Sequence, residues 1–502
     1  MIKNPEDRIP VIVGVGEITD KPANPEQGLE PLALMQEVLK RAEDDAGAKL
    51  IDAIDSIDLV NLVSWRYEDP ARQLCERLGI GPKRAVYGPV GGEAPIRYLH
   101  EAGLRIQRGE SVVAAICGAE AQYTVNKAEK TKVKLPWTPY AEHGVTSVRN
   151  VSYQHPMARA LGVAQPITVY PFYDAATATH WGQTPREALR ESSQLWSTFS
   201  SVAAKNPYSW IKRSVDADTI MTPTADNRLI AWPYNKLMVA NPQVNQGAAL
   251  ILTSLANAKR LGIPANACVH FIGGASAEEP RDYLQRDQFV ESYAQNAVLR
   301  SVMDIVGGDG TKFDAIELYS CFPCVPKMAR RTLGFGADVQ PTVTGGLTFF
   351  GAPLNSYMTH AACAMVRRVR GGVQHGLLYG QGGFVTKHHA LVLSPEQAAE
   401  PLSESVSVQA IADRDRKPAP AYDEQPSGEG TVESFTVIYD RDGSAKHGVV
   451  ILRTRANDRT LARVPADDKT TLERLLDLDR TPIGISGTIR KAADDIPEWQ
   501  AA

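Results

Sequence analysis

The stretch Ala85-Val86-Tyr87-Gly88-Pro89-Val90-Gly91-Gly92-Glu93-Ala94-Pro95 runs from a short apolar strand through a glycine turn into a helix. Glycine lets the backbone turn sharply and approach a ligand or a second chain closely. The N-terminus of the helix that follows favours negative charge. The spacing matches neither a dinucleotide fingerprint nor a Gly-Lys-Ser/Thr phosphate loop. Taken alone, the stretch is typical of a tight strand–helix turn, and a ligand site is the alternative.

Strand-like and helix-like segments alternate on both sides of this turn, and the alternation recurs in the second half of the chain. Such an order favours a mostly parallel sheet covered by helices on both faces. Two similar halves imply an internal duplication with pseudo-twofold symmetry. The segments are strands at 9–16, 56–62, 85–87, 111–117, 268–273, 315–318, 376–379 and 390–393, and helices at 29–46, 70–78, 94–108, 290–306 and 355–370.

The rhythm breaks in the middle and at the end of the chain. Residues 123–228 are rich in Pro, Trp and Tyr and predict a long insertion with short helices, such as 185–200. We therefore divide the chain into an N-terminal half, an inserted loop domain, a C-terminal half and a further domain. The boundaries are 1–122 with 229–258, then 123–228, 259–402 and 403–502.

The last 100 residues favour β-structure. A Pro-rich and Gly-rich linker precedes two apolar runs, 431–439 and 448–454, which flank the turn Asp440-Arg441-Asp442-Gly443-Ser444. This pattern is typical of a hairpin. With further strands near 460–464 and 483–488, it predicts a small β-rich domain, resembling an OB barrel.

The bulk composition excludes several classes of protein. A net charge of −4 over 502 residues gives no electrostatic case for nucleic acid or for an anionic membrane. No apolar run reaches the roughly 18–20 residues that span a bilayer, and residues 1–7 have no apolar segment typical of a signal peptide. Six cysteines in so long a chain favour free thiols in a reducing cytoplasm. The basic group Lys127, Lys130, Lys132 and Lys134 is interpreted as a solvated loop face, or alternatively as a contact to a phosphate-bearing ligand such as CoA.

Two more glycine-rich turns, at 345–354 and 380–383, lie near strand ends and could line one cleft with the first. Together with Ile230-Ala231-Trp232-Pro233-Tyr234-Asn235-Lys236-Leu237-Met238 and Asn245-Gln246-Gly247-Ala248-Ala249, their order resembles the thiolase superfamily. The resemblance covers roughly residues 8–395 and is strongest to type 1 thiolase-like proteins, relatives of the sterol-carrier-protein-type thiolases that carry an additional C-terminal domain. It implies an α/β fold of five αβαβα layers built from two halves, and acyl-CoA substrates.

The resemblance also shows where catalytic groups are absent. A thiolase uses a nucleophilic Cys at a helix N-terminus, a His in a Gly-His-Pro turn and a late Cys as acid and base. None of these is present, so covalent thiolase chemistry is not expected. By resemblance, the corresponding positions are Gly92 (or Gly91 or Glu93 if the alignment shifts), Tyr319 in the His-Asp-Cys-Phe stretch, Ala352 in the Gly-His-Pro turn, and Tyr379 or Gly380 at the late Cys.

A few other residues are weaker candidates for a site. Glu93 should stay ionised at its helix N-terminus, where it could cap the helix or act as a base. Cys321 pairs with Cys324 in a Cys-Phe-Pro-Cys stretch that has no second pair at zinc spacing, so two buried free thiols are expected, with Cys321 the best thiol candidate. Backbone contacts to a ligand are assigned to Gly346, Gly382 and Gly383. The group Lys387, His388 and His389 is interpreted as solvated or structural.

The sequence therefore predicts an acyl-CoA-handling protein without thiolase activity. No metal and no bound cofactor are expected beyond a CoA or acyl-CoA ligand. The alternatives are an atypical acyltransferase of lipid or acyl-CoA metabolism and a non-catalytic subunit that meets a protein partner through its C-terminal domain. A synthase that uses Cys321 is a third alternative.

Overall fold

The computed structural model describes residues 5–144 and 153–502. Its centre is a nine-stranded sheet in the order β3-β2-β4-β7-β1-β8-β11-β10-β9. Five strands come from the first half of the chain and four from the second. They are β1 (Pro10–Thr19), β2 (Ser56–Leu59), β3 (Arg84–Tyr87), β4 (Val113–Ala121), β7 (Asn245–Ser254), β8 (Val269–Glu278), β9 (Ala315–Leu318), β10 (Gly376–Gly382) and β11 (Lys387–Ser394).

The two halves meet at the middle of this sheet, where β1 pairs with β8 through Val11 opposite His270 and Ile12 opposite Val269. Each half places its first strand at this junction and its last strand next to it. The order then runs outward as β4-β2-β3 on one side and β10-β9 on the other. This matching order confirms the duplication predicted from the sequence.

The prediction of a mostly parallel sheet is wrong. Five of the eight strand pairs are antiparallel, and the parallel pairs are β2–β3, β2–β4 and β9–β10, on the outer side of each half. Only four residues separate β10 from β11. A connection that short makes a hairpin, whereas a parallel crossover needs a dozen or more residues.

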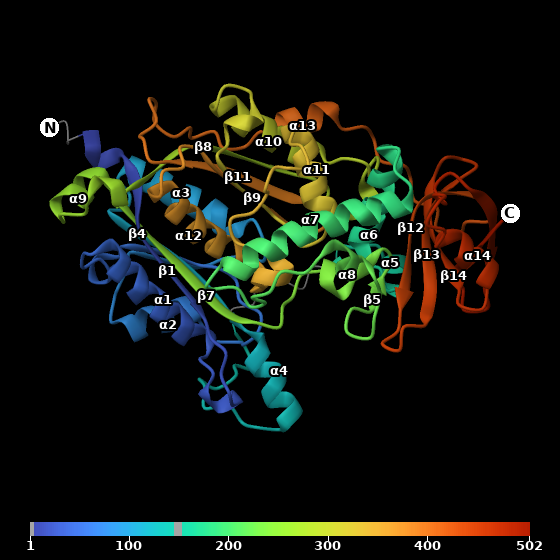
Figure 1. Cartoon of the computed structure of the whole chain (residues 1–502), viewed down its shortest axis with the longest axis horizontal. Helices are drawn as coiled ribbons and strands as arrows, with labels where there is room; N and C mark the ends of the chain where they lie inside the picture. The colour runs from blue at the N-terminus through green and yellow to red at the C-terminus, as the bar shows by residue number, and fades with distance from the viewer. Residues whose placement is uncertain (1–4, 145–152) are drawn as a thin grey trace.

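The strands of the two halves form two layers that are joined at the β1–β8 pair, and the helices complete five layers (Figure 1). Helices α3 (Ala94–Arg108) and α12 (Tyr357–Arg370) pack on each other and on strands of both halves, so they form the middle layer. Helices α1 (Pro31–Ala46) and α2 (Pro70–Leu78) cover one outer face, and α10 (Tyr293–Ile305) and α11 (Cys324–Leu333) cover the other. The fold is therefore the thiolase-like αβαβα arrangement. Short α9 (Leu255–Arg260) links the halves.

The inserted segment is more helical than predicted. Helix α7 extends five residues beyond the predicted end, to Lys205. Its start is well defined, because Thr184 and Glu187 form a reciprocal capping box and Pro185 occupies the first turn. The elements of this segment are α4 (Gln122–Thr131), α5 (Pro156–Ala160), α6 (Pro166–His180), α7 (Pro185–Lys205) and α8 (Ala217–Met221), followed by β5 (Leu229–Ala231) and β6 (Tyr234–Asn235).

The C-terminal segment is a closed five-stranded barrel, which confirms the predicted small β-rich domain. Its strands run in the order β13-β14-β16-β15-β12, and β12 pairs with β13 to close the ring. The predicted hairpin is present, since Tyr439 lies opposite Ala445. The elements are α13 (Gln409–Asp415), β12 (Gly428–Tyr439), β13 (Ala445–Thr454), β14 (Arg459–Pro465), α14 (Lys469–Leu475), β15 (Ser486–Lys491) and β16 (Pro497–Ala501).

The barrel docks on the body of the protein through the outer face of β12, β13 and β14. Val449 and Ile451 belong to the main core, whereas Val450 and Leu452 of the same strand belong to the barrel core. Arg459 is fully buried and donates hydrogen bonds to the Leu284 carbonyl, at 2.7 Å, and to the Glu433 carboxylate. OB folds bind oligonucleotides and oligosaccharides on the corresponding strands. In this chain that face is occupied by the chain itself.

Across residues 5–144 and 153–502, no helix combines the length and the apolar character that crossing a bilayer would require. Residues 1–4, part of the stretch where no signal peptide is expected, lie outside the described residues.

Candidate functional site

Gly92 lies at the start of α3, buried against the chain that follows β9. A Cβ atom added at Gly92 would overlap the Tyr319 hydroxyl oxygen and the Gln381 carbonyl oxygen. The position that the resemblance assigns to a nucleophilic thiol is therefore filled by a tyrosine hydroxyl. Burial raises the pKa of Tyr319 well above its ordinary value, so this hydroxyl stays protonated. Within the described residues it makes no hydrogen bond.

The Glu93 carboxylate lies next to Gly92, in a space that depends on two glycines. A Cβ at Gly91 or at Gly382 would overlap this carboxylate. Glu93 is 4% exposed, and its Oε2 atom has no hydrogen-bond partner in the described structure. Its Oε1 atom lies 3.4 Å from the ammonium of Lys387, which is itself partly exposed.

The prediction that Glu93 caps its helix is wrong, because its side chain makes no capping hydrogen bond. The helix dipole is not the main influence on whether the Glu93 carboxyl is charged. Burial raises the pKa of the Glu93 carboxyl, and the charges of Lys387 and Arg97 offset that rise only in part. The possibility that Glu93 acts as a base is unaffected by these corrections.

The turn that contains Ala352 is tied to the start of α3. The Gly91 N–H donates to the Asn355 side-chain oxygen at 3.0 Å, and the Asn355 amide donates to the Asn61 carbonyl at 3.1 Å. Ala352 is 1% exposed, and its own N–H donates to the Asn241 carbonyl. Two of the sequence-predicted turns thus meet here, although a methyl group replaces the imidazole that a thiolase has.

The two candidates for the position of the late cysteine, Tyr379 and Gly380, face opposite sides of strand β10. A Cβ at Gly380 would lie 3.0 Å from Ile96 and 3.1 Å from the Cα of Glu93, so Gly380 faces the start of α3. Tyr379 points to the opposite face, where its hydroxyl lies 2.7 Å from His388 Nδ1 and accepts from Gln295 at 2.8 Å. Of the two, only Gly380 borders Glu93.

Cys321 lies on the far side of β10 from Glu93, among aromatic and amide groups. The Gln381 side-chain amide donates to the Tyr170 hydroxyl at 2.6 Å and to the Cys321 sulfur at 3.2 Å. Burial raises the pKa of the Cys321 thiol to about 12. A thiol with so high a pKa is mostly protonated at neutral pH and is a poor nucleophile.

The remaining candidates have structural surroundings. A Cβ at Gly346 would overlap the Phe199 ring of α7, so this glycine serves close packing. Gly383 has a φ of 71° and its carbonyl accepts from the Tyr170 hydroxyl at 2.8 Å. His388 and His389 are both buried, so the structural interpretation holds and the solvated one is wrong. Burial also lowers the pKa of His388 to about 4.

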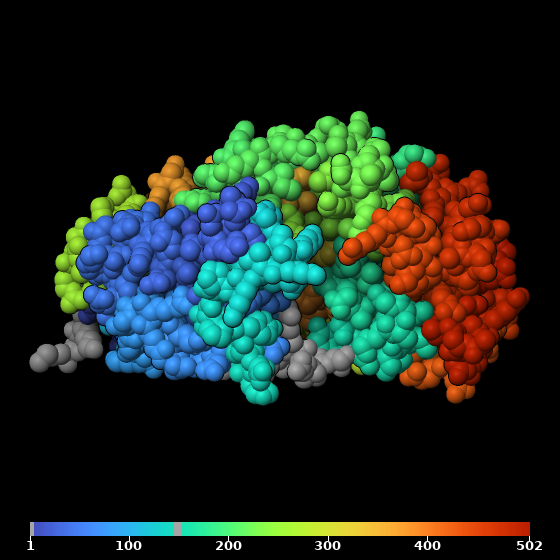
Figure 2. Space-filling model, turned by 90° about the horizontal axis from the view of Figure 1, so that it is seen from below, coloured from blue at the N-terminus to red at the C-terminus, as the bar shows by residue number. Residues whose placement is uncertain are grey.

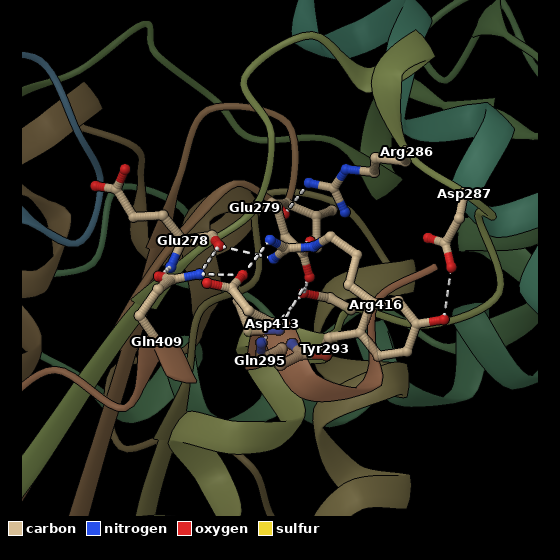
Figure 3. A network of polar contacts seen from close by, with 12 residues as sticks. Glu278, Glu279, Arg286, Asp287, Tyr293, Gln295, Gln409, Asp413 and Arg416 are labelled. Atoms are coloured by element: carbon tan, nitrogen blue, oxygen red, sulfur yellow. Dashed lines mark hydrogen bonds and ion pairs between the residues drawn. The ribbon is translucent and has the colours of Figure 1, made fainter. Parts of the chain in front are cut away.

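A further polar network connects the segment that follows the C-terminal half to the body (Figure 3). The sequence did not predict it. Arg416 donates to the Glu279 carboxylate at 2.9 Å, and Gln409 donates to the Glu278 carbonyl at 2.9 Å. Glu279 also accepts from the Ser292 hydroxyl at 2.8 Å. Because this hydroxyl donates to a carboxylate, Ser292 is not activated by the nearby His388, and the network is structural.

A hollow opens on one side of the molecule between the segment that includes α4 and the segment that includes α5 and α6 (Figure 2). The β12–β13 turn of the barrel leans toward it. Helix α4 carries part of a basic and aromatic group that we call the rim patch. The rim patch consists of Lys21, Tyr123, Lys127, Trp210 and Lys212.

The rim patch has a net positive charge. The Lys21 ammonium lies 4.8 Å from the Trp210 ring centre, and the Lys127 ammonium lies 5.8 Å from the Tyr123 ring centre. The two rings are 5.1 Å apart. In the described structure no carboxylate lies within 4.0 Å of Lys21, Lys127 or Lys212. The backbone N–H of Trp210 donates to the Phe350 carbonyl, two residues before Ala352, so the patch is anchored near the candidate site.

No cluster of three or more His, Cys, Asp or Glu side chains suited to a metal ion occurs within the described residues. Thus the described part of the candidate site consists of a buried carboxylate, a tyrosine hydroxyl without a partner and glycine backbone.

The comparisons with known proteins concern the fold and the C-terminal domain. The family described as "Thiolase-like protein type 1 additional C-terminal domain" matches residues 409–494. A monomeric SCP2-thiolase-like protein type 1 from Mycobacterium smegmatis is 28% identical over 99% of this chain and 100% of that one, with a TM-score of 0.83. No curated protein matches the chain.

Two further solved structures share the fold over about three quarters of this chain. An Ltp2-ChsH2(DUF35) aldolase has a TM-score of 0.58 at 18% identity, over 77% of this chain and 97% of that one. Human mitochondrial 3-ketoacyl-CoA thiolase has a TM-score of 0.55 at 13% identity, over 77% of this chain and 98% of that one. Nearly all of each of these chains is covered, so the rest of this chain is additional to the shared fold.

Proposed function

Because this chain is a thiolase-like protein with an additional C-terminal domain, we propose that it binds an acyl-CoA and does not use covalent thiolase chemistry. One observation carries the proposal. The backbone of Gly92 has no room for a Cβ atom, since the Tyr319 hydroxyl and the Gln381 carbonyl oxygen occupy that space. This packing and the absence of a thiol both support the proposal that no acyl-enzyme forms at this position.

The rim patch supports the choice of CoA as ligand. CoA carries several phosphate charges and an adenine ring. Lysine ammonium groups without carboxylate partners attract phosphates, and the Tyr123 and Trp210 rings offer a surface for a base. Helix α4, which carries Tyr123 and Lys127 of the patch, belongs to the segment on one side of the hollow in Figure 2.

Calorimetric titration with CoA, acetyl-CoA and acetoacetyl-CoA tests the proposal. We expect binding of at least one, with a loss of about tenfold in affinity for Lys127→Ala, since one charged hydrogen bond contributes roughly 1.5 kcal/mol. Lys130→Ala on the same helix is the matched control, because Lys130 is exposed and lies outside the rim patch. Absence of binding by all three ligands, or equal losses in both variants, would contradict the proposal.

A thiolysis assay tests the synthase that uses Cys321. With acetoacetyl-CoA and free CoA, we expect no acetyl-CoA above the buffer rate, because the thiol is buried and its pKa is about 12. Turnover by the unmodified protein that disappears in Cys321→Ser would reverse this conclusion.

A role as a subunit or an atypical acyltransferase is the second candidate. One similar solved structure, the Ltp2-ChsH2(DUF35) aldolase, is named for two components. In this chain the β12–β14 face of the barrel is already buried, so a partner would meet the outer face of β15 and β16, where Thr488, Arg490 and Gln500 are exposed. Size-exclusion chromatography of a natively expressed, tagged chain tests this, and a strictly solitary protein that binds acyl-CoA would contradict it.

The proposed compartment is the reducing cytoplasm. All six cysteines are unpaired and buried, which fits this assignment.

A further inference from the structure

A cavity of about 490 Å³ lies where the inserted segment meets the C-terminal barrel. Its walls come from α6, α7, the turn between β5 and β6, and strand β12, which lie together in Figure 1. None of its lining residues belongs to the rim patch or to the groups around Gly92. Ligand cavities occur preferentially at junctions of this kind, so this one is a candidate for a second binding site.

Small side chains on two helices open this cavity. Ala175 and Ala178 of α6 and Ala188 of α7 line it, and larger residues there would fill the space. On the barrel side and at the turn, the walls are formed by the side chains of Phe435 and Trp232. The surface that a ligand meets is therefore mainly hydrocarbon.

The charged and hydroxyl groups in the deep wall are bonded within the protein. Asp174 is the only residue with a charged side chain among those that line the cavity in the described structure. One oxygen of its carboxylate accepts from the Lys327 ammonium at 2.6 Å, and the other accepts from the Tyr234 hydroxyl at 2.8 Å. The Ser192 hydroxyl accepts from the same ammonium at 3.0 Å. An ionic ligand therefore finds no free counter-charge in this wall.

The exposure of the lining residues shows which end of the cavity is near solvent. Thr179 and Thr481 are partly exposed, and their hydroxyl oxygens lie 2.8 Å apart. Tyr234 and Met238 are 0% and 1% exposed. The cavity therefore extends from the surface near the two threonines to a closed end at Tyr234 and Met238.

A hydrocarbon suits such a cavity better than water or an ion does. A buried water needs roughly two to four polar partners, whereas the deep polar groups here are bonded to one another. An ion that entered would give up its hydration without gaining a counter-charge. A hydrocarbon leaves water and gains dispersion contacts with the lining atoms.

We propose that this cavity is a binding site for an uncharged hydrocarbon group, either an alkyl chain or an aromatic ring. A bound group contacts α6, α7 and β12 together and so stabilises the junction between the inserted segment and the barrel. The site shares no residue with the rim patch, and the inference does not depend on CoA binding.

Calorimetric titration of the full chain with 1-butanol, 1-hexanol and 1-octanol tests the inference. We expect the affinity to rise roughly fourfold with each added methylene, because each one removed from water contributes a similar increment. Octanoate has the same chain length with a charge, and it should bind at least about tenfold more weakly than 1-octanol. Benzyl alcohol distinguishes the two kinds of ligand. Tighter binding than 1-hexanol assigns the site to an aromatic ring, and weaker binding assigns it to an alkyl chain.

Variants of the wall show whether the alcohols bind in this cavity. Ala188→Leu places a larger side chain in the cavity and should lower the affinity for 1-octanol about tenfold or more. Gln194→Leu is the matched control, because Gln194 lies on the same helix, is exposed and does not line the cavity. Met238→Ala lengthens the closed end and should raise the affinity for 1-decanol relative to 1-octanol, a gain that loss of folding does not produce.

Three results would overturn the inference. The first is an unmodified protein that binds neither the alkanols nor benzyl alcohol. The second is equal binding of 1-octanol by Ala188→Leu and by Gln194→Leu, which would place the alcohol outside the cavity. The third is octanoate that binds as tightly as 1-octanol, since this would require a counter-charge that the wall does not provide.

Discussion

Glu93 and Glu317 are two buried carboxylates whose surroundings differ sharply. Glu317, on β9, accepts from the Tyr357 hydroxyl at 2.6 Å, the Val343 N–H at 2.8 Å and the Thr344 N–H at 3.1 Å. Glu93, beside Gly92, has one ammonium at 3.4 Å and an oxygen with no partner in the described structure. Burial alone does not distinguish the two, since Glu317 is 0% exposed and Glu93 is 4% exposed.

The difference separates a structural carboxylate from a candidate functional one. The partners of Glu317 come from the chain itself, from the 342–344 turn and from α12, so the carboxylate holds three elements together. The Glu93 Oε2 atom has no such partner among the described residues. A buried charge that is fully hydrogen-bonded supports the fold, and one that is not costs stability and needs another reason to persist.

Replacing Glu317 should have the largest effect on stability. Glu317→Ala leaves the Val343 N–H without its acceptor and removes one acceptor each from the Tyr357 hydroxyl and the Thr344 N–H, and we expect a loss of about 3–5 kcal/mol. Thermal unfolding followed by circular dichroism measures this. Glu404→Ala is the control, because Glu404 is exposed and paired with Arg108 at the surface, and its melting temperature should hardly change. A similar melting temperature for both variants would show that Glu317 is not structural.

Filling the space at Gly92 should have an intermediate effect. Gly92→Ala forces a methyl group against the Tyr319 hydroxyl and should destabilise the fold by about 1–3 kcal/mol. Adding Tyr319→Ala should recover part of that loss, because the two residues contact each other. Gly81→Ala is the matched control, since a Cβ there meets open space. Strictly additive losses in the double variant would show that Tyr319 does not fill the Gly92 position.

Replacing Glu93 should have the smallest effect on stability, and the effect should depend on pH. Burial raises the pKa of Glu93 in the folded protein, so the folded state holds its proton more tightly than the unfolded state. Stability is therefore lost as pH rises from the ordinary glutamate value of about 4.3 through the raised value. Glu93→Gln should melt like the unmodified protein near pH 4 and at a higher temperature above the raised pKa. A variant that is less stable at every pH would place Glu93 with Glu317, as a structural group.

Residue patterns predicted the fold better than the site. The alternation of apolar and amphipathic segments identified the two halves, and the Asp440–Ser444 turn identified the β12–β13 hairpin. The direction of the strands was not predictable, because whether a strand pairs parallel or antiparallel depends on the route of its connection. The length of α7 was underestimated, although its Thr184 and Glu187 capping pair gives its start.

The site was predictable as a set of positions and not as a set of contacts. The resemblance located Gly92, Ala352 and Gly380 from short motifs. Gly92 and Tyr319, which lie against each other, are more than 200 positions apart in the sequence. The same holds for Glu93 and Lys387. No local pattern encodes such pairs, because they arise when α3 packs against strands of the other half.

The amino-acid sequence is enough to predict two similar α/β halves, an insertion with helices, a β-rich end and no thiol or imidazole at the positions that the resemblance assigns to thiolase catalysis. These properties follow from local periodicity and from residue identity. Three features become visible only in the folded chain: Tyr319 fills the space beside Gly92, the chain itself covers the barrel face, and no described residue bonds one oxygen of Glu93. Those are outcomes of packing, in which the position of each side chain depends on segments remote in the sequence.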